Sequence, residues 1–272
     1  MTLATVQQLF IHPIKGLTPQ ECHAAVLKVG HGMKGDRAFA LMFIEEGQTL
    51  ESAETVPWKS KKYFAVQNDW PGLARLECSY DPETAELTVC RRNNSQITPT
   101  LLVAKTNTTS GRAEIRSFFT GYLAGLQPTD AARHPSHGPL ELVGSEHGET
   151  RYSDRESGHI SLISQATLDD ISSSLGTEVD LRRFRPNIVL DGVPAWGEFD
   201  WVGKELQLGD SRIAISAPIG RCVNIEVNPI SGDRDLPLCR LLPEHFGHLQ
   251  TGVVAKVLDG GTIQIGDRLQ IS

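Results

Sequence analysis

The chain has 272 residues, a formal net charge of −7, 39% hydrophobic residues and 22% charged residues. That length allows two domains or one large β-rich unit with a sizeable core. The negative balance argues against binding to nucleic acid or to an anionic membrane, because both favour a basic surface.

Neither the termini nor the cysteines indicate export. The first residues lack the basic and apolar regions of a secretory signal, and no later apolar run is long enough to span a bilayer. The five cysteines are odd in number and show no close pairing, a pattern that suggests neither a disulfide framework nor a zinc or iron–sulfur site. We therefore expect a protein of a reducing cytoplasm with free thiols and no membrane span.

Short strands separated by turns dominate the first part of the chain. Strand-like patterns cover residues 6–11, 24–29 and 38–44. Lys15 lies in the proline- and glycine-containing turn after the first, and Arg37 ends the glycine-containing loop before the third. That loop precedes a strand and lacks the phosphate-loop pattern, so it predicts a rim loop rather than a nucleotide site. Residues 45–70 have mixed charges and predict a solvated, mobile excursion.

A hairpin and a helix follow. Residues 73–80 and 86–91 flank a turn at 81–85, and the apolar spacing over 110–123 predicts a helix. Residues 128–149 are rich in Pro, Gly, His and Ser, which predicts a domain junction and a division into 1–127 and 128–272.

The second half begins with a strand over 159–163 that leads into a helix. Ser164 is the expected N-cap of that helix and Gly176 its end, and a capped helix start can bind an anion. Pro186 predicts an extended backbone at Arg185. Arg185 and Asn187 flank that proline and form a suitable fork for a phosphate or a polar heterocycle.

Cys222 lies where a loop enters a predicted sheet. Strands are expected over 205–208 and 212–216, and the alternation of Val223, Ile225 and Val227 predicts a further half-buried strand. Arg221 beside Cys222 would favour the thiolate. Cys222 read alone is equally consistent with a small buried core residue.

In the last part of the chain, the spacing of apolar residues over 236–246 predicts short helical pieces, because two prolines interrupt the helix. The alternating residues of 252–258 and 262–271 predict a hairpin. Many short strands, few helices and no regular β–α alternation predict a mainly β protein, with a barrel and peripheral helices.

Several separated motifs resemble those of the MOSC-domain proteins (molybdenum cofactor sulfurase C-terminal domain) with a preceding MOSC N-terminal β-barrel domain. The sequences at 12–16 and 35–37 are similar to that N-terminal domain's YPxKS and GDR motifs, and 161–168, 183–187, 220–222 and 266–267 follow the MOSC pattern in order. The resemblance spans nearly the whole chain. It implies a MOSC-type β-barrel with peripheral helices at 128–272, preceded by a smaller β-rich domain at 1–127.

The resemblance also implies a pterin-dithiolene molybdenum cofactor. Cys222 is then the expected molybdenum thiolate and catalytic residue, and the residues expected to bind phosphate and pterin are Lys15, Arg37, Ser164, Arg185, Asn187 and Arg221. Gly16 stands where the YPxKS turn has a serine, so that hydroxyl is not carried over. Pyridoxal phosphate binding is a second cofactor property that the family resemblance admits.

Among such proteins, the chain is most similar in outline to the amidoxime-reducing components and their bacterial relatives. That similarity implies a reductase of N-hydroxylated bases or related N–O compounds. The sequence contains neither the cysteine-rich ferredoxin extension of some bacterial relatives nor the membrane anchor of mitochondrial ones. The electrons would therefore come from a separate ferredoxin- or flavoprotein-like partner. His159 is a speculative neighbour of the pocket, with no role assigned.

Two alternatives stay open at this stage. Cys222 could carry sulfur as a persulfide, or carry the cofactor in transit to another enzyme. The chain could also be a binding module in which Cys222 is inert.

Overall fold

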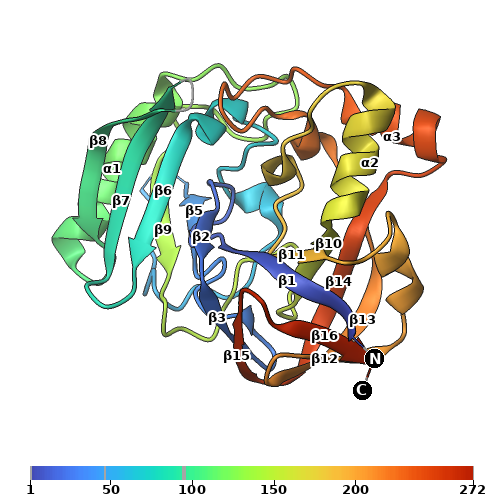
Figure 1. Cartoon of the computed structure of the whole chain (residues 1–272). Coiled ribbons are helices and arrows are strands. Elements are labelled where there is room, and N and C mark those ends of the chain that lie inside the picture. The colour runs from blue at the N-terminus through green and yellow to red at the C-terminus, as the bar shows by residue number, and fades with distance from the viewer. Residues whose placement is uncertain (1, 46, 94–95, 272) are drawn as a thin grey trace.

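The computed structural model describes residues 2–45, 47–93 and 96–271, and within them seven strands close into a barrel. The strand order is β11, β10, β14, β13, β12, β16 and β1, and β1 returns to pair with β11 (Figure 1). These strands are β1 (Thr2–Ile11), β10 (Ile160–Ser164), β11 (Ile188–Asp191), β12 (Glu205–Leu208), β13 (Ser211–Gly220), β14 (Gln250–Asp259) and β16 (Arg268–Ile271). The prediction of a mainly β barrel with peripheral helices is confirmed.

Alternating side chains fill the barrel. Leu206 and Leu208 on β12, and Ile213 and Ile215 on β13, are buried with Val257 on β14 in one apolar cluster. Successive side chains of a strand point to opposite faces, so each strand supplies every second residue to the interior.

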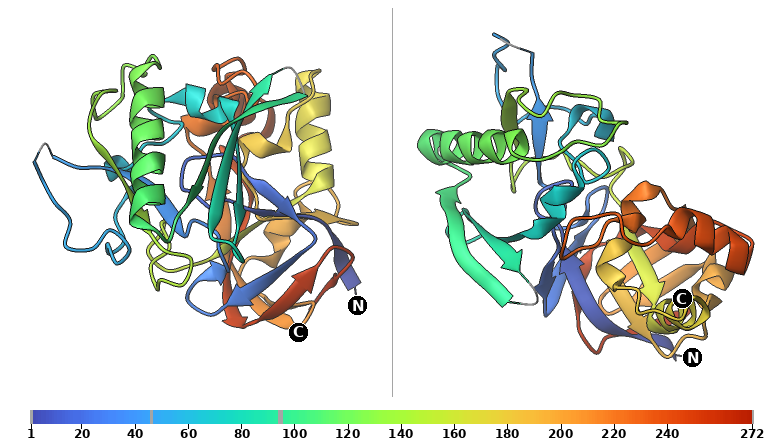
Figure 2. Two further views of the ribbon diagram at one scale, coloured as in Figure 1. Left: turned by 90° about the vertical axis from the view of Figure 1, so that its left-hand side faces the viewer. Right: turned by 90° about the horizontal axis from the view of Figure 1, so that it is seen from above.

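A second core lies beside the barrel and is formed by the middle of the chain (Figure 2). It contains the sheet β6 (Leu76–Asp81), β7 (Glu86–Asn93) and β8 (Gln96–Lys105), the pair β5 (Phe39–Phe43) and β9 (Leu140–Gly144), and helix α1 (Thr109–Ala124). The predicted hairpin at 73–91 and the predicted helix at 110–123 are both found here.

Helices α2 (Gln165–Leu175) and α3 (Leu238–Phe246) lie on the outside of the barrel. Ser164 caps α2 by accepting a hydrogen bond from Thr167 N at 3.0 Å, and Gly176 ends it with a left-handed φ of 64°. Both predictions are confirmed. The prediction of separate helical pieces around Pro243 is wrong, because α3 continues through it with Leu238 and Leu242 buried.

The predicted C-terminal hairpin is also wrong. β14 pairs with β10 and β13, whereas the following β15 (Gly261–Gln264) pairs with β3 (Ala24–Lys28), which in turn pairs with β4 (Gly32–Met33). The alternating pattern correctly indicated strands, but their partners are distant in the sequence.

The residues after Cys222 form a 3-10 helix, η5 (Val223–Glu226), instead of the predicted strand. Ile225 and Val227 are buried while Val223 is 38% exposed, so the alternation of apolar residues reflects only part of the packing. The other 3-10 helices are η1 (Lys61–Tyr63), η2 (Pro71–Arg75), η3 (Leu181–Arg183) and η4 (Gly197–Trp201).

Segments from both ends of the chain share the barrel. β1 pairs with β16 and β11, a short β2 (Gln20–Cys22) extends the sheet from β1, and β9 pairs back to β5. The division into 1–127 and 128–272 stays a prediction. The pairings of β1 with β11 and β16, and of β9 with β5, join strands on the two sides of that boundary.

Across the described residues, none of the helices combines the length and apolar character needed to cross a membrane.

Candidate functional site

A cavity of about 260 Å³ collects residues from six separate loops and turns of the chain. The turn after β1, the loop before β5, the segment around η1, the loop before β10 and the two loops after η3 and β13 all reach it. The lining includes charged and polar side chains and one cysteine: Lys15, Arg37, Lys61, Gln67, Asn68, Asp154, His159, Arg183, Arg185, Asn187, Arg221 and Cys222. Six of the seven residues singled out from the sequence therefore meet at one place.

Ser164 is the seventh, and it lies elsewhere. Its side chain is fully buried, where it caps α2 and lies 2.9 Å from Thr167 Oγ1. Glu198 completes this buried group by accepting a hydrogen bond from Ser164 N at 3.3 Å. Ser164 is not among the described residues that line the cavity, and its hydrogen bonds are those of a helix cap.

Cys222 is the exposed cysteine among the five, all of which are described. Its Sγ lies 3.7 Å from Asn68 Nδ2 and 3.8 Å from Lys61 Nζ, so two donors face the sulfur. Burial raises the pKa of Cys78 to about 12 and the pKa of Cys22 to about 11. The exposed position and the facing donors distinguish Cys222 as a sulfur that can bind a metal or react.

Arg221 holds the loop that carries Cys222. Its Nη1 donates to Phe184 O at 2.8 Å, its Nη2 donates to Thr251 O, and its guanidinium lies 5.4 Å from the centre of the Phe184 ring. Burial lowers the pKa of Arg221 to about 10. Two backbone carbonyls thus fix this side chain, while its Nε is buried and has no partner among the residues that the structure describes.

Lys15 reaches the cavity from the turn after β1. Its backbone N–H donates to Phe39 O at 2.8 Å, which ties the turn to β5, and its Nζ lies 2.6 Å from Asp154 Oδ1. Lys15 is buried and Asp154 is exposed. Burial lowers the pKa of Lys15, and Asp154 partly offsets that effect.

Arg37 and Arg185 both have a left-handed backbone, with φ of 49° and 52°. This region is rare for non-glycine residues, and such strain gathers at functional sites. The Arg37 guanidinium pairs with Asp36, and Arg185 Nη1 donates to Leu17 O at 2.6 Å. Burial lowers the pKa of Arg185 to about 10, and the nearby positive charge of Arg37 acts in the same direction.

The expectation of an extended backbone at Arg185 is therefore wrong. Arg185 N donates to Arg182 O at 3.2 Å, which closes a tight turn directly after η3. That turn aims the side chain toward the segment around Leu17, and it outweighs the usual preference of a residue before proline.

Asn187 links three strands. Its Oδ1 accepts from Ser161 N at 3.1 Å and from Ser161 Oγ at 3.0 Å, and its Nδ2 donates to Phe10 O at 3.2 Å. A side-chain amide has two N–H donors, so one of them has no partner within the described ranges and could donate to a ligand.

Sequence reasoning missed Lys61, Gln67 and Asn68. They belong to residues 45–70, which were expected to be solvated, yet Phe64, Ala65 and Trp70 in the same segment are buried. The segment has no periodic pattern that would indicate packing. Arg234 Nη2 donates to Asn68 O at 2.9 Å, and this hydrogen bond holds the segment near Cys222. The two residues are far apart in the chain, so the sequence could not indicate this contact.

His159 also lines the cavity, and its Nδ1 lies 2.9 Å from Ser157 O. Burial lowers its pKa, and Arg37 contributes to that shift. In the described part of the chain, no three His, Cys, Asp or Glu side chains gather as metal ligands. Cys222 thus offers a single sulfur ligand beside a group of cations.

Two family models together match most of this chain. The model of the MOSC N-terminal beta barrel domain matches residues 3–134, and the model of the MOSC domain matches residues 149–270. Among solved structures, the YUAD protein from Bacillus subtilis aligns over 99% of this chain and 94% of its own, with a TM-score of 0.47 and 13% identity.

Curated relatives also cover most of the chain. Mitochondrial amidoxime-reducing component 1 of Mus musculus is 27% identical over 290 residues, covering 97% of this chain and 81% of that protein. Mitochondrial amidoxime reducing component 2 of Rattus norvegicus is 39% identical over 262 residues, covering 87% of this chain and 71% of that protein. The chain therefore belongs to the MOSC-domain family and combines a MOSC N-terminal β-barrel domain with a MOSC domain.

Proposed function

We propose that the cavity at Cys222 binds a pterin-dithiolene molybdenum cofactor and that the protein reduces N-hydroxylated bases or related N–O compounds. The electrons would come from a separate ferredoxin- or flavoprotein-like partner protein. The observation that carries this proposal is an exposed cysteine sulfur on the same small cavity as Lys15, Arg37, Lys61 and Arg185. Relatives named amidoxime-reducing components, at 27% and 39% identity, support the reaction class.

The residues of the cavity fit such a cofactor. A thiolate is a soft ligand and suits a sulfur-rich metal centre, while guanidinium and ammonium groups suit its phosphate. Two buried donor atoms, Arg183 Nε and Arg221 Nε, have no partner among the described residues, although both side chains line the cavity. Buried donors are normally satisfied, so a ligand with acceptor oxygens or nitrogens would complete them.

Each part of the chain would have a distinct task. Cys222 would ligate molybdenum, with the amide of Asn68 and the ammonium of Lys61 close to the sulfur. Lys15, Arg37 and Arg185 would hold the anionic part of the cofactor. When bound, the cofactor would supply two-electron redox chemistry, and the protein would orient it and the substrate.

Cofactor analysis of matched cysteine variants tests the proposal. The chain is produced in a host that makes the pterin cofactor, and molybdenum and oxidised pterin are measured for wild type, Cys222→Ala and Cys90→Ala. We expect molybdenum and pterin in wild type and in Cys90→Ala, because Cys90 is a half-buried residue of strand β7. We expect loss of molybdenum, and of turnover of an N-hydroxylated base with an artificial electron donor, in Cys222→Ala. Wild type without metal and pterin under saturating supply would contradict the proposal.

A second function, transfer of sulfur or cofactor to another enzyme, is favoured by the exposure of Cys222 itself. An accessible thiol can form a persulfide and be reached by a second protein. This alternative predicts cofactor retention without turnover, and a mass increase of one sulfur atom on the peptide that contains Cys222. Binding of pyridoxal phosphate and a cytoplasmic location stay predictions.

A further inference from the structure

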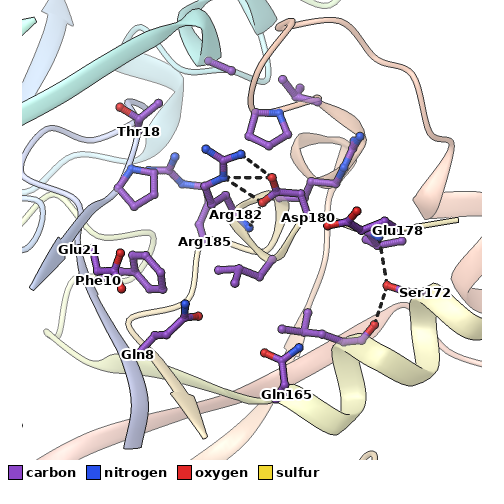
Figure 3. A pocket seen from close by; sticks show the side chains of 18 of the residues that line it. Gln8, Phe10, Thr18, Glu21, Gln165, Ser172, Glu178, Asp180, Arg182 and Arg185 are labelled. Carbon is purple, nitrogen blue, oxygen red and sulfur yellow. Dashed lines mark hydrogen bonds and ion pairs between the residues drawn. The ribbon is translucent and has the colours of Figure 1, made fainter. Parts of the chain in front are cut away.

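A second cavity, of about 460 Å³, lies between β1, the loop at 17–21, α2 and η3 (Figure 3). It shares Gln67, Arg183 and Arg185 with the cavity at Cys222, and these residues form the boundary between the two. Cys222 is not among the described residues that line it. Its volume falls in the range of small-molecule sites, roughly 300–1,000 Å³.

One part of this cavity is apolar. Phe10, Leu168, Val179 and Val227 all line it, and each of them is at most 7% exposed. Small-molecule sites typically combine such an apolar surface with a few polar groups that fix orientation. A ligand with an apolar body would bury that body here.

The charged groups around the cavity leave an excess of negative charge. Five carboxylates line it, against three guanidinium groups: Glu21, Glu77, Asp169, Glu178 and Asp180, and Arg182, Arg183 and Arg185. Each guanidinium group already has at least one acceptor in the protein, although Arg183 Nε has none among the described residues. Arg182 Nε lies 2.9 Å from Asp180 Oδ1, Arg183 Nη2 lies 2.6 Å from Asp235 Oδ1, and Arg185 donates to Leu17 O.

Two of the carboxylates, both exposed, have no partner in the described part of the chain. Within the described residues, neither Glu21 nor Glu178 makes a side-chain hydrogen bond or an ion pair, and Figure 3 shows them on opposite sides of the cavity. Because the lining carries two more carboxylates than guanidinium groups and these two carboxylates are unpaired, the cavity favours a cation.

Two amides provide a second, independent indication of a ligand. Gln67 is only 7% exposed, lines the cavity and has no side-chain hydrogen bond to any described residue. The Oε1 atom of Gln8, which also lines the cavity, is buried and has no partner in the described part of the chain. A buried carbonyl left without a donor costs about 1–3 kcal/mol, so N–H donors of a ligand would relieve that cost.

We propose that this cavity binds a small guanidinium compound with an apolar body, such as an arylguanidinium. The planar cation carries several N–H donors in a fixed arrangement, which matches carboxylate and amide acceptors placed around one space. The apolar body would lie against Phe10 and its neighbours. The proposal is independent of the function assigned to Cys222. Of the acceptors proposed for the guanidinium compound, only Gln67 also lines the cavity at Cys222.

Calorimetric titration with phenylguanidinium tests the proposal, and phenylurea serves as the neutral compound of the same shape. We expect one molecule of phenylguanidinium to bind with a dissociation constant of roughly millimolar or below. Phenylurea should bind at least about tenfold more weakly. The titration is repeated with Cys222→Ala, where the affinity should be unchanged whether or not the cofactor proposal holds.

Two sets of variants locate the binding. The double variant Glu21→Gln/Glu178→Gln should weaken phenylguanidinium binding roughly fivefold or more, because two charge-assisted contacts are lost. Gln8→Met removes the buried acceptor at similar volume and should weaken binding while leaving the melting temperature unchanged or raised. Glu114→Gln, on the exposed face of α1, is the matched control and should change nothing. No binding of phenylguanidinium, equal binding of phenylurea, or full affinity in the double variant would overturn the proposal.

Discussion

Gly16 has a left-handed φ of 82° and lies against the segment that carries Lys61 and Asn68. A Cβ added to Gly16 would lie 2.7 Å from Ala65 O and 3.0 Å from Val66 Cα, both backbone atoms. The absence of the serine found in the related YPxKS turn therefore has a physical reason in this chain. The backbone of residues 65–66 occupies the space that a side chain would need.

We therefore predict that Gly16→Ser lowers the free energy of unfolding by about 2–4 kcal/mol, from backbone strain and the enforced displacement of residues 65–66. The same displacement should reduce cofactor content. Gly30→Ser is the control, because Gly30 also has a positive φ, of 78°, but a Cβ added there would meet no described atom within 4 Å beyond its chain neighbours. It should lose only about 1 kcal/mol. Urea denaturation of both variants tests this, and equal losses would show that the close approach is unimportant.

His12 is fully buried, and its Nδ1 lies 3.4 Å from Asp36 Oδ1. Burial, with the nearby charges of Arg37 and Arg185, lowers the pKa of His12 from 6.5 to about 3, against the opposing effect of Asp36. The folded protein thus keeps this ring neutral at pH values where the unfolded chain protonates it. The contribution of neutral His12 to the unfolding free energy is fully present above pH 6.5 and is lost as the pH falls from 6.5 toward 3.

We predict that the unfolding free energy of wild type falls by about 1.4 kcal/mol per pH unit through this group over that range. His12→Phe should be less pH-dependent between pH 6.5 and 4, because it removes the titrating ring and retains an aromatic side chain. His147→Asn changes an exposed histidine and should follow the wild-type curve. Denaturant unfolding at several pH values measures these slopes, and parallel curves for wild type and His12→Phe would contradict the prediction.

At the scale of elements, the start of α2 tests whether Ser164 serves to cap the helix or to bind a ligand. The Ser164 hydroxyl caps the helix from a fully buried position apart from the cavity. Ser164→Ala should lower the unfolding free energy by about 1–2 kcal/mol and leave the molybdenum content unchanged. Ser174→Ala, at an exposed position of the same helix, should alter neither quantity appreciably. Loss of molybdenum without loss of stability would place Ser164 in the binding site.

Elements with local signals were predictable, and those fixed by distant contacts were not. The α2 caps and the β6–β7 hairpin depend on residues a few positions apart, so the sequence indicated them correctly. The pairing of β15 with β3 depends on a strand more than 200 residues earlier in the chain, and no pattern within β15 could indicate it.

The same distinction applies to the candidate site. Short motifs drew attention to Lys15, Arg37, Arg185 and Cys222, which meet at one cavity. Asn68 comes from a segment with no periodic pattern, and only the fold brings its amide to 3.7 Å from Cys222 Sγ. The left-handed turn at Arg185 was also unpredictable, because the local preference before Pro186 favours the opposite conformation.

For the whole molecule, the barrel requires both ends of the chain. β1 lies between β16 and β11 and closes the ring, and Ala4, Val6 and Leu9 from β1 are buried in the barrel core. A fragment of residues 128–272 would contain the MOSC domain match at 149–270 but lack this strand. The edges of β11 and β16 would then be unpaired, and the apolar interior would face water along the gap.

We therefore predict that residues 128–272 expressed alone do not unfold cooperatively and associate through the open edges. Supplying residues 1–127 as a separate chain in the same cell should restore a soluble complex of the two, because β1 can then pair with β11 and β16 across the break. Circular dichroism during thermal unfolding and size-exclusion chromatography measure these properties, with the intact chain as the control. A soluble, monomeric and cooperatively unfolding 128–272 fragment would contradict the prediction and would show that the barrel can close without β1.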